Sequence, residues 1–226
     1  MEKIKVDFIL IILSCYKYKH KALKQKETWL KNLPSNIKYF HIIGDKKICD
    51  DKNIHIDFNE NIIYCNSDDD YNSLPSKVIT TLEGINELFD YKYIFKTDDD
   101  QNLKKPNFFI QFPKLILNKD PISHYGGFSI IVNSHISNYY MIHNCLPKDI
   151  KLEATTYCNG RFYYLSKSAV ENLILKKELI KNRYIEDHAI GYYLDDSFKN
   201  NMEKFDSRKC FDDYYEFNQW IGTPHE

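Results

Sequence analysis

Apolar runs alternate with helical patterns along the first half of the chain. Val6 to Ser14 is apolar almost throughout, which is typical of a parallel strand covered on both faces. His20 to Leu33 follows with apolar residues at helical spacing, and Lys38 to Ile43 predicts a second strand. Short strands are expected at Ile54–Asp57 and Ile62–Cys65. The order strand, helix, strand predicts an α/β fold with parallel pairing.

A further helix and strand lead to a cluster of acids. Leu74 to Phe89 places its apolar residues on one helical face, with Ser73 as the expected N-cap and Pro75 in the first turn, where proline is tolerated. Tyr93 to Thr97 then predicts a strand that runs directly into Asp98-Asp99-Asp100. Because a crossover helix precedes this strand, we expect its carboxyl end at the edge of the sheet where open α/β folds bind ligands.

The second half of the chain predicts shorter elements. We expect a helix over Phe108–Leu117 interrupted by Pro113, then strands around a Gly126-Gly127 turn within His124–Tyr140, and a strand-turn-strand over Thr155–Ser166. A capping box at Ser168–Glu171 should open a helix that runs to about Ile180. A helix over Tyr184–Leu194 with two acids in its first turn and a strand around Tyr214–Phe217 follow. No repeat or linker separates these elements, so residues 1–226 are expected to form a single domain.

The triplet Asp98-Asp99-Asp100 is suited to a hard divalent cation. Mg²⁺ and Mn²⁺ prefer oxygen ligands, and in proteins they commonly bridge a carboxylate to the phosphates of a nucleotide. Three adjacent carboxylates without a counter-ion are unfavourable, since each raises the pKa of its neighbours. A solvated acidic turn is the alternative interpretation of the same residues.

Composition excludes some classes of function. The formal net charge of −1 gives no general attraction to nucleic acid. The apolar run Val6 to Leu13 is too short to cross a bilayer and lacks a cleavage site after it, so we expect no transmembrane segment, no signal peptide and a cytoplasmic location. The six cysteines form no C-x-x-C pair, which argues against structural zinc and favours reduced thiols. Abundant Lys, Ile and Asn indicate an A/T-rich genome, such as that of a virus or microbe.

Four motifs occur in order between residues 24 and 191. The first is Lys24-Gln25-Lys26-Glu27-Thr28-Trp29, and the second, at a helix start, is Asp70-Tyr71-Asn72-Ser73-Leu74-Pro75-Ser76-Lys77. The third is Phe95-Lys96-Thr97-Asp98-Asp99-Asp100, and the fourth combines Tyr157-Cys158-Asn159-Gly160 with Ile185-Glu186-Asp187-His188-Ala189-Ile190-Gly191. Together they resemble the β1,3-glycosyltransferase superfamily of the galactosyltransferase and Fringe type. Each motif is weak alone, but four in this order are specific.

The resemblance implies a GT-A fold, which is Rossmann-like, with a mixed central sheet flanked by helices. It also implies a UDP-sugar donor, Mn²⁺ or Mg²⁺ held at this DxD-type motif, and inversion at the anomeric carbon. By the same resemblance Asp100 and Asp98 are metal ligands, and Asp98 and Asp99 contact the donor. A late histidine often completes the metal shell in the family, and His225 is the histidine in the tail of this chain.

Asp187 is implied as the general base that takes the proton from the acceptor hydroxyl. At a helix N-terminus the macrodipole favours its ionised form. Glu186, Gly160, Lys26 and Lys77 are expected to contact the donor. The alternative interpretations are structural: the two acids stabilise their own helix, the lysines cover apolar surface with their stems, and Gly160 lies in an ordinary hairpin.

These observations predict a metal-dependent inverting glycosyltransferase that moves a hexose or N-acetylhexosamine from a UDP-sugar to a hydroxyl of a glycan or glycoprotein acceptor, forming a β1,3 link. Lysines replace the usual arginines, and Arg161 follows Gly160 where a small residue is common, which leaves the donor and acceptor open. Two alternatives also stay open. One is a non-catalytic binder of sugar nucleotides or glycans, and the other is a Mg²⁺-dependent nucleotidyltransferase that uses Asp68–Asp70 as a second acidic cluster.

Overall fold

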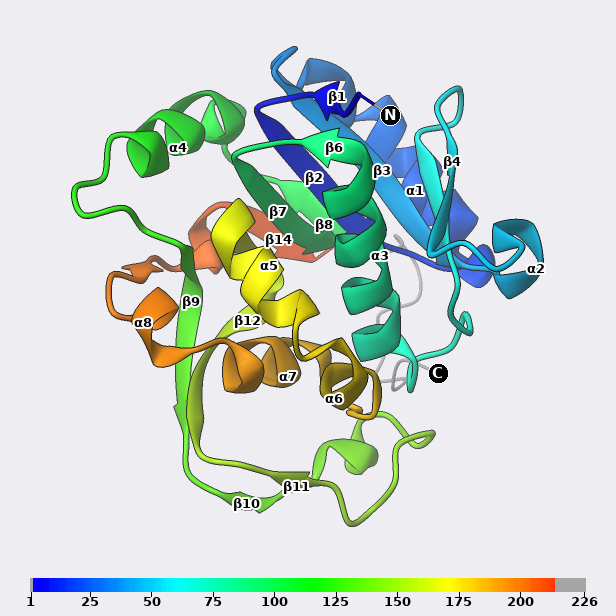
Figure 1. Cartoon of the computed structure of the whole chain (residues 1–226), viewed down its shortest axis with the longest axis vertical. Coiled ribbons are helices and arrows are strands. Elements are labelled where there is room, and N and C mark those ends of the chain that lie inside the picture. The colour runs from blue at the N-terminus through cyan, green and yellow to red at the C-terminus, as the bar shows by residue number, and fades with distance from the viewer. Residues whose placement is uncertain (1, 214–226) are drawn as a thin grey trace.

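A mixed sheet of eight strands forms the centre of the molecule (Figure 1). The structure is a computed structural model that describes residues 2–213. In spatial order the strands are β13 (Glu203–Lys204), β9 (Tyr125–Val132), β12 (Thr155–Ser166), β7 (Tyr93–Asp98), β2 (Phe8–Leu13), β3 (Ile37–Gly44), β5 (Ile62–Cys65) and β4 (Ile54–Asp57). The strands β7, β2, β3 and β5 are parallel, whereas β12 runs antiparallel to both β7 and β9. The expected α/β fold with a mixed central sheet is confirmed.

Helices cover both faces of this sheet. The longer ones are α1 (Lys19–Glu27), α3 (Leu74–Leu88), α4 (Phe108–Leu117), α5 (Lys167–Ile174) and α7 (Glu186–Tyr193). The shorter helices and 3₁₀ turns are η1 (Tyr16–Tyr18), η2 (Leu30–Asn32), α2 (Lys46–Cys49), η3 (Tyr139–Met141), α6 (Lys177–Lys181), α8 (Asp196–Lys199) and η4 (Ser207–Lys209). Three small sheets pair β1 (Ile4–Lys5) with β6 (Phe89–Asp90), β8 (Gln101–Leu103) with β14 (Phe211–Asp213), and β10 (His135–Ile136) with β11 (Lys151–Leu152).

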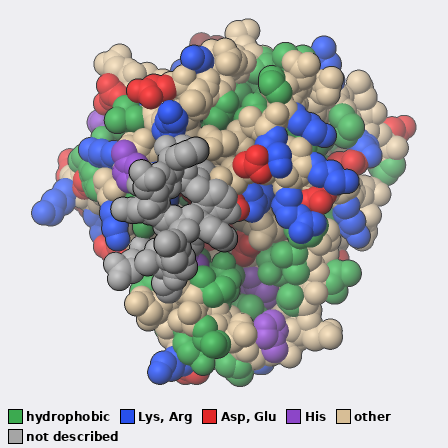
Figure 2. Space-filling view, turned by 180° about the vertical axis from the view of Figure 1, so that it is seen from behind, with side chains coloured by type: hydrophobic (Ala, Val, Ile, Leu, Met, Phe, Trp, Pro, Cys, Tyr) green, Lys and Arg blue, Asp and Glu red, His purple; other side chains and the backbone are tan. Residues whose placement is uncertain are grey.

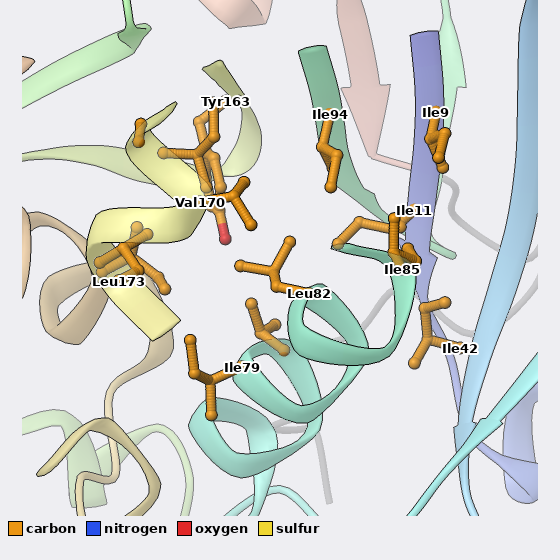
Figure 3. Close-up of a cluster of buried hydrophobic side chains, with 14 of the residues drawn as sticks. Ile9, Ile11, Ile42, Ile79, Leu82, Ile85, Ile94, Tyr163, Val170 and Leu173 are labelled. Carbon is orange, nitrogen blue, oxygen red and sulfur yellow. The ribbon is translucent and has the colours of Figure 1, made fainter. Parts of the chain in front are cut away.

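Alternate residues of β2 enter two different cores. Ile9 and Ile11 join a cluster with residues of α3, α5 and α7, and Figure 3 shows Ile85 of α3 beside Ile11. Phe8 and Leu10 point to the opposite face, where aromatic residues of α4 pack. Both faces of the strand are therefore buried, which explains why its sequence is apolar throughout.

The first predicted helix ends earlier than its spacing suggested. α1 stops at Glu27, because Thr28 leaves the helical conformation and its hydroxyl donates to the Lys24 carbonyl (2.7 Å). Leu23, expected on the buried face, is 55% exposed, whereas Gln25 is 2% exposed. The buried side of α1 thus carries an amide where the pattern predicted an apolar residue.

Two glycine-containing turns were predicted wrongly. Gly126-Gly127 lies inside the continuous strand β9, where a Cβ on Gly126 would meet the Glu203 carbonyl oxygen at 2.4 Å. Asn159-Gly160 lies inside the single strand β12. Asn159 and Gly160 have no partner on either neighbouring strand, because the ladder to β7 begins at Phe162 and the ladder to β9 is irregular between Cys158 and Tyr163. This stretch is therefore a bulge within the strand and not a turn.

The other predicted elements of the second half agree with expectation apart from details at helix ends. Proline at position 113 lies inside α4 without ending it. Ser166, not Ser168, caps α5 by accepting from the Ala169 amide, and the helix expected to reach Ile180 is broken into α5 and α6. All six cysteines are free thiols. Across residues 2–213 there is no helix with the length and apolar content needed to cross a membrane. The strand expected around Tyr214–Phe217 lies outside the described residues.

Candidate functional site

The acidic triplet lies at the carboxyl end of a central strand. β7 is hydrogen-bonded between β2 and β12 and ends at Asp98, and Asp99-Asp100 form the turn into β8. Because side chains alternate along a strand, Lys96 and Asp98 point to the same face of the sheet. This alternation places a cation beside the first acid of the triplet.

Lys96 connects the triplet to the distant helix α7. Its side chain is 2% exposed, and its ammonium nitrogen lies 2.8 Å from Asp98 Oδ1 and 3.1 Å from Glu186 Oε2. The same nitrogen donates to the Gly160 carbonyl oxygen at 2.8 Å. Three segments far apart in the sequence therefore meet at one buried positive charge.

The two acids at the start of α7 have different surroundings. Glu186 is buried, and its carboxylate accepts from the Tyr163 hydroxyl as well as pairing with Lys96. Asp187 is half-buried; its Oδ2 accepts from the Gly160 amide (2.9 Å) and its Oδ1 from the His188 amide (2.8 Å). Asp187 is thus the more accessible carboxylate, and backbone groups fix its orientation.

Burial and charge act against each other in this cluster. Burial raises the pKa of Glu186 and of Asp187, while the charge of Lys96 lowers both. Burial lowers the pKa of Lys96, but the charges of Asp98 and Glu186 outweigh it and the pKa is raised. Lys96 therefore stays protonated, and Asp187 is a stronger base than an exposed aspartate. The helix N-terminus was expected to favour ionisation of Asp187, and burial works in the opposite direction.

Asp98 and Asp99 of the triplet have raised pKa values. Burial raises the pKa of Asp98 to about 6, with Lys96 lowering it and the charge of Asp100 raising it further. Burial raises the pKa of Asp99 to about 7, partly offset by a hydrogen bond from the Ser14 hydroxyl (2.8 Å). A bound cation would reduce the repulsion between these acids and favour their ionised forms.

Asp100 is tied to the other end of the described chain. Its Oδ1 accepts from the Gln101 side-chain amide (2.8 Å), which also donates to Asp213 on β14 (2.8 Å). Arg161 donates to the Gln101 side-chain oxygen (2.8 Å) and pairs with both carboxylate oxygens of Asp213. Arg161, the residue of β12 that departs from the family pattern, therefore contacts Asp100 indirectly, through the side chain of Gln101.

Both lysines expected to contact the donor are engaged elsewhere. Lys77 is 1% exposed, and its ammonium contacts the Ser14 carbonyl oxygen (2.8 Å) and Asp69 (2.7 Å). Lys26 contacts the carbonyl oxygen and the carboxylate of Glu60. The structure brings Asp98, Gly160, Glu186 and Asp187 together and does not bring Lys26 into their contacts. His225 lies outside the described residues.

A family comparison places the chain among known proteins. The model of the family described as Galactosyltransferase matches residues 21–201, which is most of the chain. The chain belongs to the galactosyltransferase family. The resemblance drawn from the four motifs is confirmed, and no curated protein sequence matched the chain.

Solved structures agree with this galactosyltransferase assignment at the level of fold. A glycosyltransferase involved in the glycosylation of the major capsid of PBCV-1 has a TM-score of 0.50 at 13% identity, over 89% of this chain and 82% of its own. GlyE of Streptococcus pneumoniae TIGR4 is also similar, with a TM-score of 0.48 at 10% identity over 90% of this chain. The galactosyltransferase LgtC has a TM-score of 0.45 at 11% identity, over 88% of this chain and 74% of its own. The chain spans 46% of the length of GlyE. The fold is GT-A, and family and fold together support a glycosyltransferase.

Three contributors to the site were missed in the sequence of this galactosyltransferase family member. Lys96 was visible in its motif but received no role, although a spacing of two residues to Asp98 on a strand indicates a shared face. Tyr163 resembles any other strand aromatic, and only the fold sets its hydroxyl against Glu186. Gln25 gave no periodic signal, because it lies among polar residues of α1.

Replacing Tyr163 by Phe is expected to lower the free energy of unfolding by about 1.5–3 kcal/mol at pH 7, the usual contribution of a hydrogen bond to a charged group. The change leaves one buried oxygen of Glu186 without its donor and raises the pKa of that carboxyl further. A carboxyl with a raised pKa in the folded state is protonated there at a higher pH than in the unfolded state. The loss of unfolding free energy should therefore shrink as the pH falls toward 5. Denaturant unfolding at both pH values measures this.

Tyr164→Phe is the matched control. Its hydroxyl is also buried, but it pairs with the neutral Ser123 hydroxyl. A similar loss that does not change with pH is expected for this control. A Tyr163→Phe deficit that is equally independent of pH would contradict the assignment of the charge to Glu186.

Proposed function

We propose that this chain is a metal-dependent inverting glycosyltransferase that transfers a hexose or N-acetylhexosamine from a UDP-sugar to a hydroxyl of a glycan or glycoprotein, forming a β1,3 link. The observation that carries the proposal is the shared Lys96 ammonium. It joins Asp98 at the strand end to Glu186, the neighbour of Asp187. This shared ion pair supports a single site that holds both a donor-side acid and the proposed proton acceptor, as inverting transfer would require.

Asp187 is the proposed base. Inversion needs a carboxylate that removes the proton of the attacking hydroxyl as the new glycosidic bond forms. Both oxygens of Glu186 are engaged by Tyr163 and Lys96 within the core, whereas Asp187 is half-buried and held by backbone amides. The raised pKa of Asp187 makes it better able to accept that proton.

Asp98 and Asp100 are the proposed metal ligands. Their carboxylate oxygens suit Mn²⁺ or Mg²⁺, and the repulsion that Asp100 exerts on Asp98 favours a bound cation. In the part of the chain between residues 2 and 213, no group of three or more His, Cys, Asp or Glu side chains is arranged to hold a metal ion. Further ligands would come from the donor diphosphate and from His225. When bound, the ion would neutralise the charge of the departing UDP.

The remaining proposed donor contacts fall into two groups, those beside the Lys96 ammonium and the turn, and two lysines that are paired elsewhere. Asp98, Glu186 and Gly160 lie around the Lys96 ammonium. A Cβ on Gly160 would lie 3.2 Å from Lys96 Nζ, so a larger residue there would crowd the shared ammonium. Asp99 would contact the donor through the same turn. Lys77 and Lys26 would reach the donor only by leaving their present partners, Asp69 and Glu60.

No observation favours the two alternative functions. A nucleotidyltransferase would need free acids at Asp68–Asp70, but Asp69 is paired with Lys77 and accepts from two backbone amides, and Asp70 accepts from the Ser73 amide. A non-catalytic binder would have no use for a raised proton affinity at Asp187. Both alternatives are separated from the proposed function by the products of the reaction.

The test is release of UDP from UDP-glucose, UDP-galactose and UDP-N-acetylglucosamine, each with Mn²⁺ and with EDTA. We expect release with at least one donor, dependence on the metal, and an increase when a glycan acceptor is added. Mass spectrometry of the products distinguishes transfer of a sugar from transfer of a nucleotidyl group. Absence of both UDP release and nucleotide binding would overturn the proposal.

A further inference from the structure

The side-chain amide of Gln25 donates hydrogen bonds to the backbone of the turn that carries the triplet. Gln25 of α1 is 2% exposed, and its side-chain nitrogen donates to the backbone carbonyl oxygens of Asp98 (3.0 Å) and Gln101 (2.8 Å). These two carbonyls lie on either side of Asp99-Asp100. A single side chain therefore spans the base of the turn.

A histidine fixes which way this amide points. His41 Nε2 lies 3.0 Å from Gln25 Oε1, and an amide oxygen only accepts hydrogen bonds. The histidine must therefore carry its proton on Nε2, and both amide hydrogens of Gln25 are left for the two carbonyls. Burial and the charge of Lys26 lower the pKa of His41 to about 3, so the ring stays neutral and keeps this arrangement near pH 7.

A third donor supports the same turn. Trp29 Nε1 donates to the Gln101 carbonyl oxygen at 3.2 Å, while its ring stacks on Phe109 at 5.8 Å between centroids. The α1 side of the turn thus supplies three hydrogen bonds to backbone oxygens. None of these donors contacts a carboxylate of the triplet.

We propose that Gln25 is a positioning residue that fixes the backbone between Asp98 and Gln101, so that the carboxylates of Asp98 and Asp100 are held in place for a metal–nucleotide complex. This inference rests on the proposed function. A turn with three like charges tends to spread apart, and donors on its far side oppose that movement without competing for the carboxylates. Residues that orient metal ligands without contacting the metal typically change its affinity about 10–100-fold when they are removed.

The test compares Gln25→Met with the unmodified chain in a titration of Mn²⁺ in the presence of UDP, following the electron paramagnetic resonance signal of free Mn²⁺. Methionine keeps the length of the side chain and removes both donors. We expect Mn²⁺ binding to weaken by about 10–100-fold. In turnover assays the KM for the donor should rise while the KM for the acceptor stays the same.

Ser123→Ala is the control for a general loss of stability. Ser123 is buried and donates to the Asn201 carbonyl oxygen (2.7 Å). It lies just before β9, near the end of the sheet where β7 begins and not where the triplet lies. Its thermal unfolding midpoint should fall about as far as that of Gln25→Met, with Mn²⁺ affinity unchanged. Equal loss of affinity in both variants would overturn the inference, because the effect would then be general.

Trp29→Phe provides a second variant if Gln25→Met does not fold. It keeps the stacked ring and removes one of the two donors to Gln101, so we expect roughly fivefold weaker Mn²⁺ binding. Unchanged Mn²⁺ binding in the folded variants, alongside normal binding by the unmodified chain, would overturn this inference alone. No Mn²⁺ binding by the unmodified chain with UDP would overturn the metal-dependent function and this inference with it.

Discussion

Asp187→Asn is expected to reduce sugar transfer by about 100- to 10,000-fold, the usual contribution of a general base, while UDP-sugar and Mn²⁺ still bind. The amide cannot accept the proton of the acceptor hydroxyl. Its carbonyl oxygen can still accept from either the Gly160 or the His188 amide, so the start of α7 should keep its place. Transfer rate and donor affinity, measured by product formation and calorimetry, separate the two effects.

Asp195→Asn is the matched control for this change. Asp195 is an exposed acid that pairs with Lys176, outside the cluster around Lys96. Its transfer rate should equal that of the unmodified chain. If Asp187→Asn also transferred sugar at the full rate, the assignment of the base would be wrong, and Glu186 would have to be tested in its place.

Asp100→Ala is expected to weaken metal-dependent binding of UDP by at least about 100-fold, because direct contact with a divalent ion contributes several kcal/mol. Asp100 is the better choice for this test than Asp98. Removal of Asp98 would also break the pair with Lys96 and disturb the acids of α7, whereas Asp100 accepts a hydrogen bond from the side chain of Gln101. Calorimetric titration of UDP with Mn²⁺ and with EDTA measures the loss.

Asp212→Ala controls for the loss of negative charge near the turn. Asp212 lies on β14, opposite Asn102 of β8, and pairs with Lys104 near the surface. It should leave UDP binding unchanged. The metal ligand assignment fails if Asp100→Ala binds UDP with Mn²⁺ as tightly as Asp212→Ala does.

Periodicity in the sequence was sufficient for the parallel half of the sheet. The apolar run of β2 and the apolar face of α3 each bury their residues in one continuous core, so local pattern and final environment agree. The position of the acids at a strand end followed from the crossover helix before β7. The pairing of that strand end with α7 came from motif order, because no local signal links residues almost ninety positions apart.

Other features depended on tertiary contacts. Asn159-Gly160 has the composition of a turn, but it forms a bulge between two paired stretches of β12, Thr155–Cys158 against β9 and Phe162–Ser166 against β7. Leu23 and Gln25 exchange their expected environments, since the buried face of α1 meets backbone carbonyls at the triplet as well as apolar side chains. A polar side chain that satisfies buried carbonyls looks the same in sequence as one that faces water.

The irregular stretch of β12 between Cys158 and Tyr163 has a consequence for how relatives of this chain can diverge. Four residues there face one on β9, so the peptide at Gly160 is released from the ladder and its N–H and C=O reach Asp187 and Lys96. Insertions between β9 and β12 can lengthen the outer loop without moving these groups. Deletion of one residue from the irregular stretch reverses which side chains face α7, and natural variation should therefore accumulate in the loop and spare this bulge.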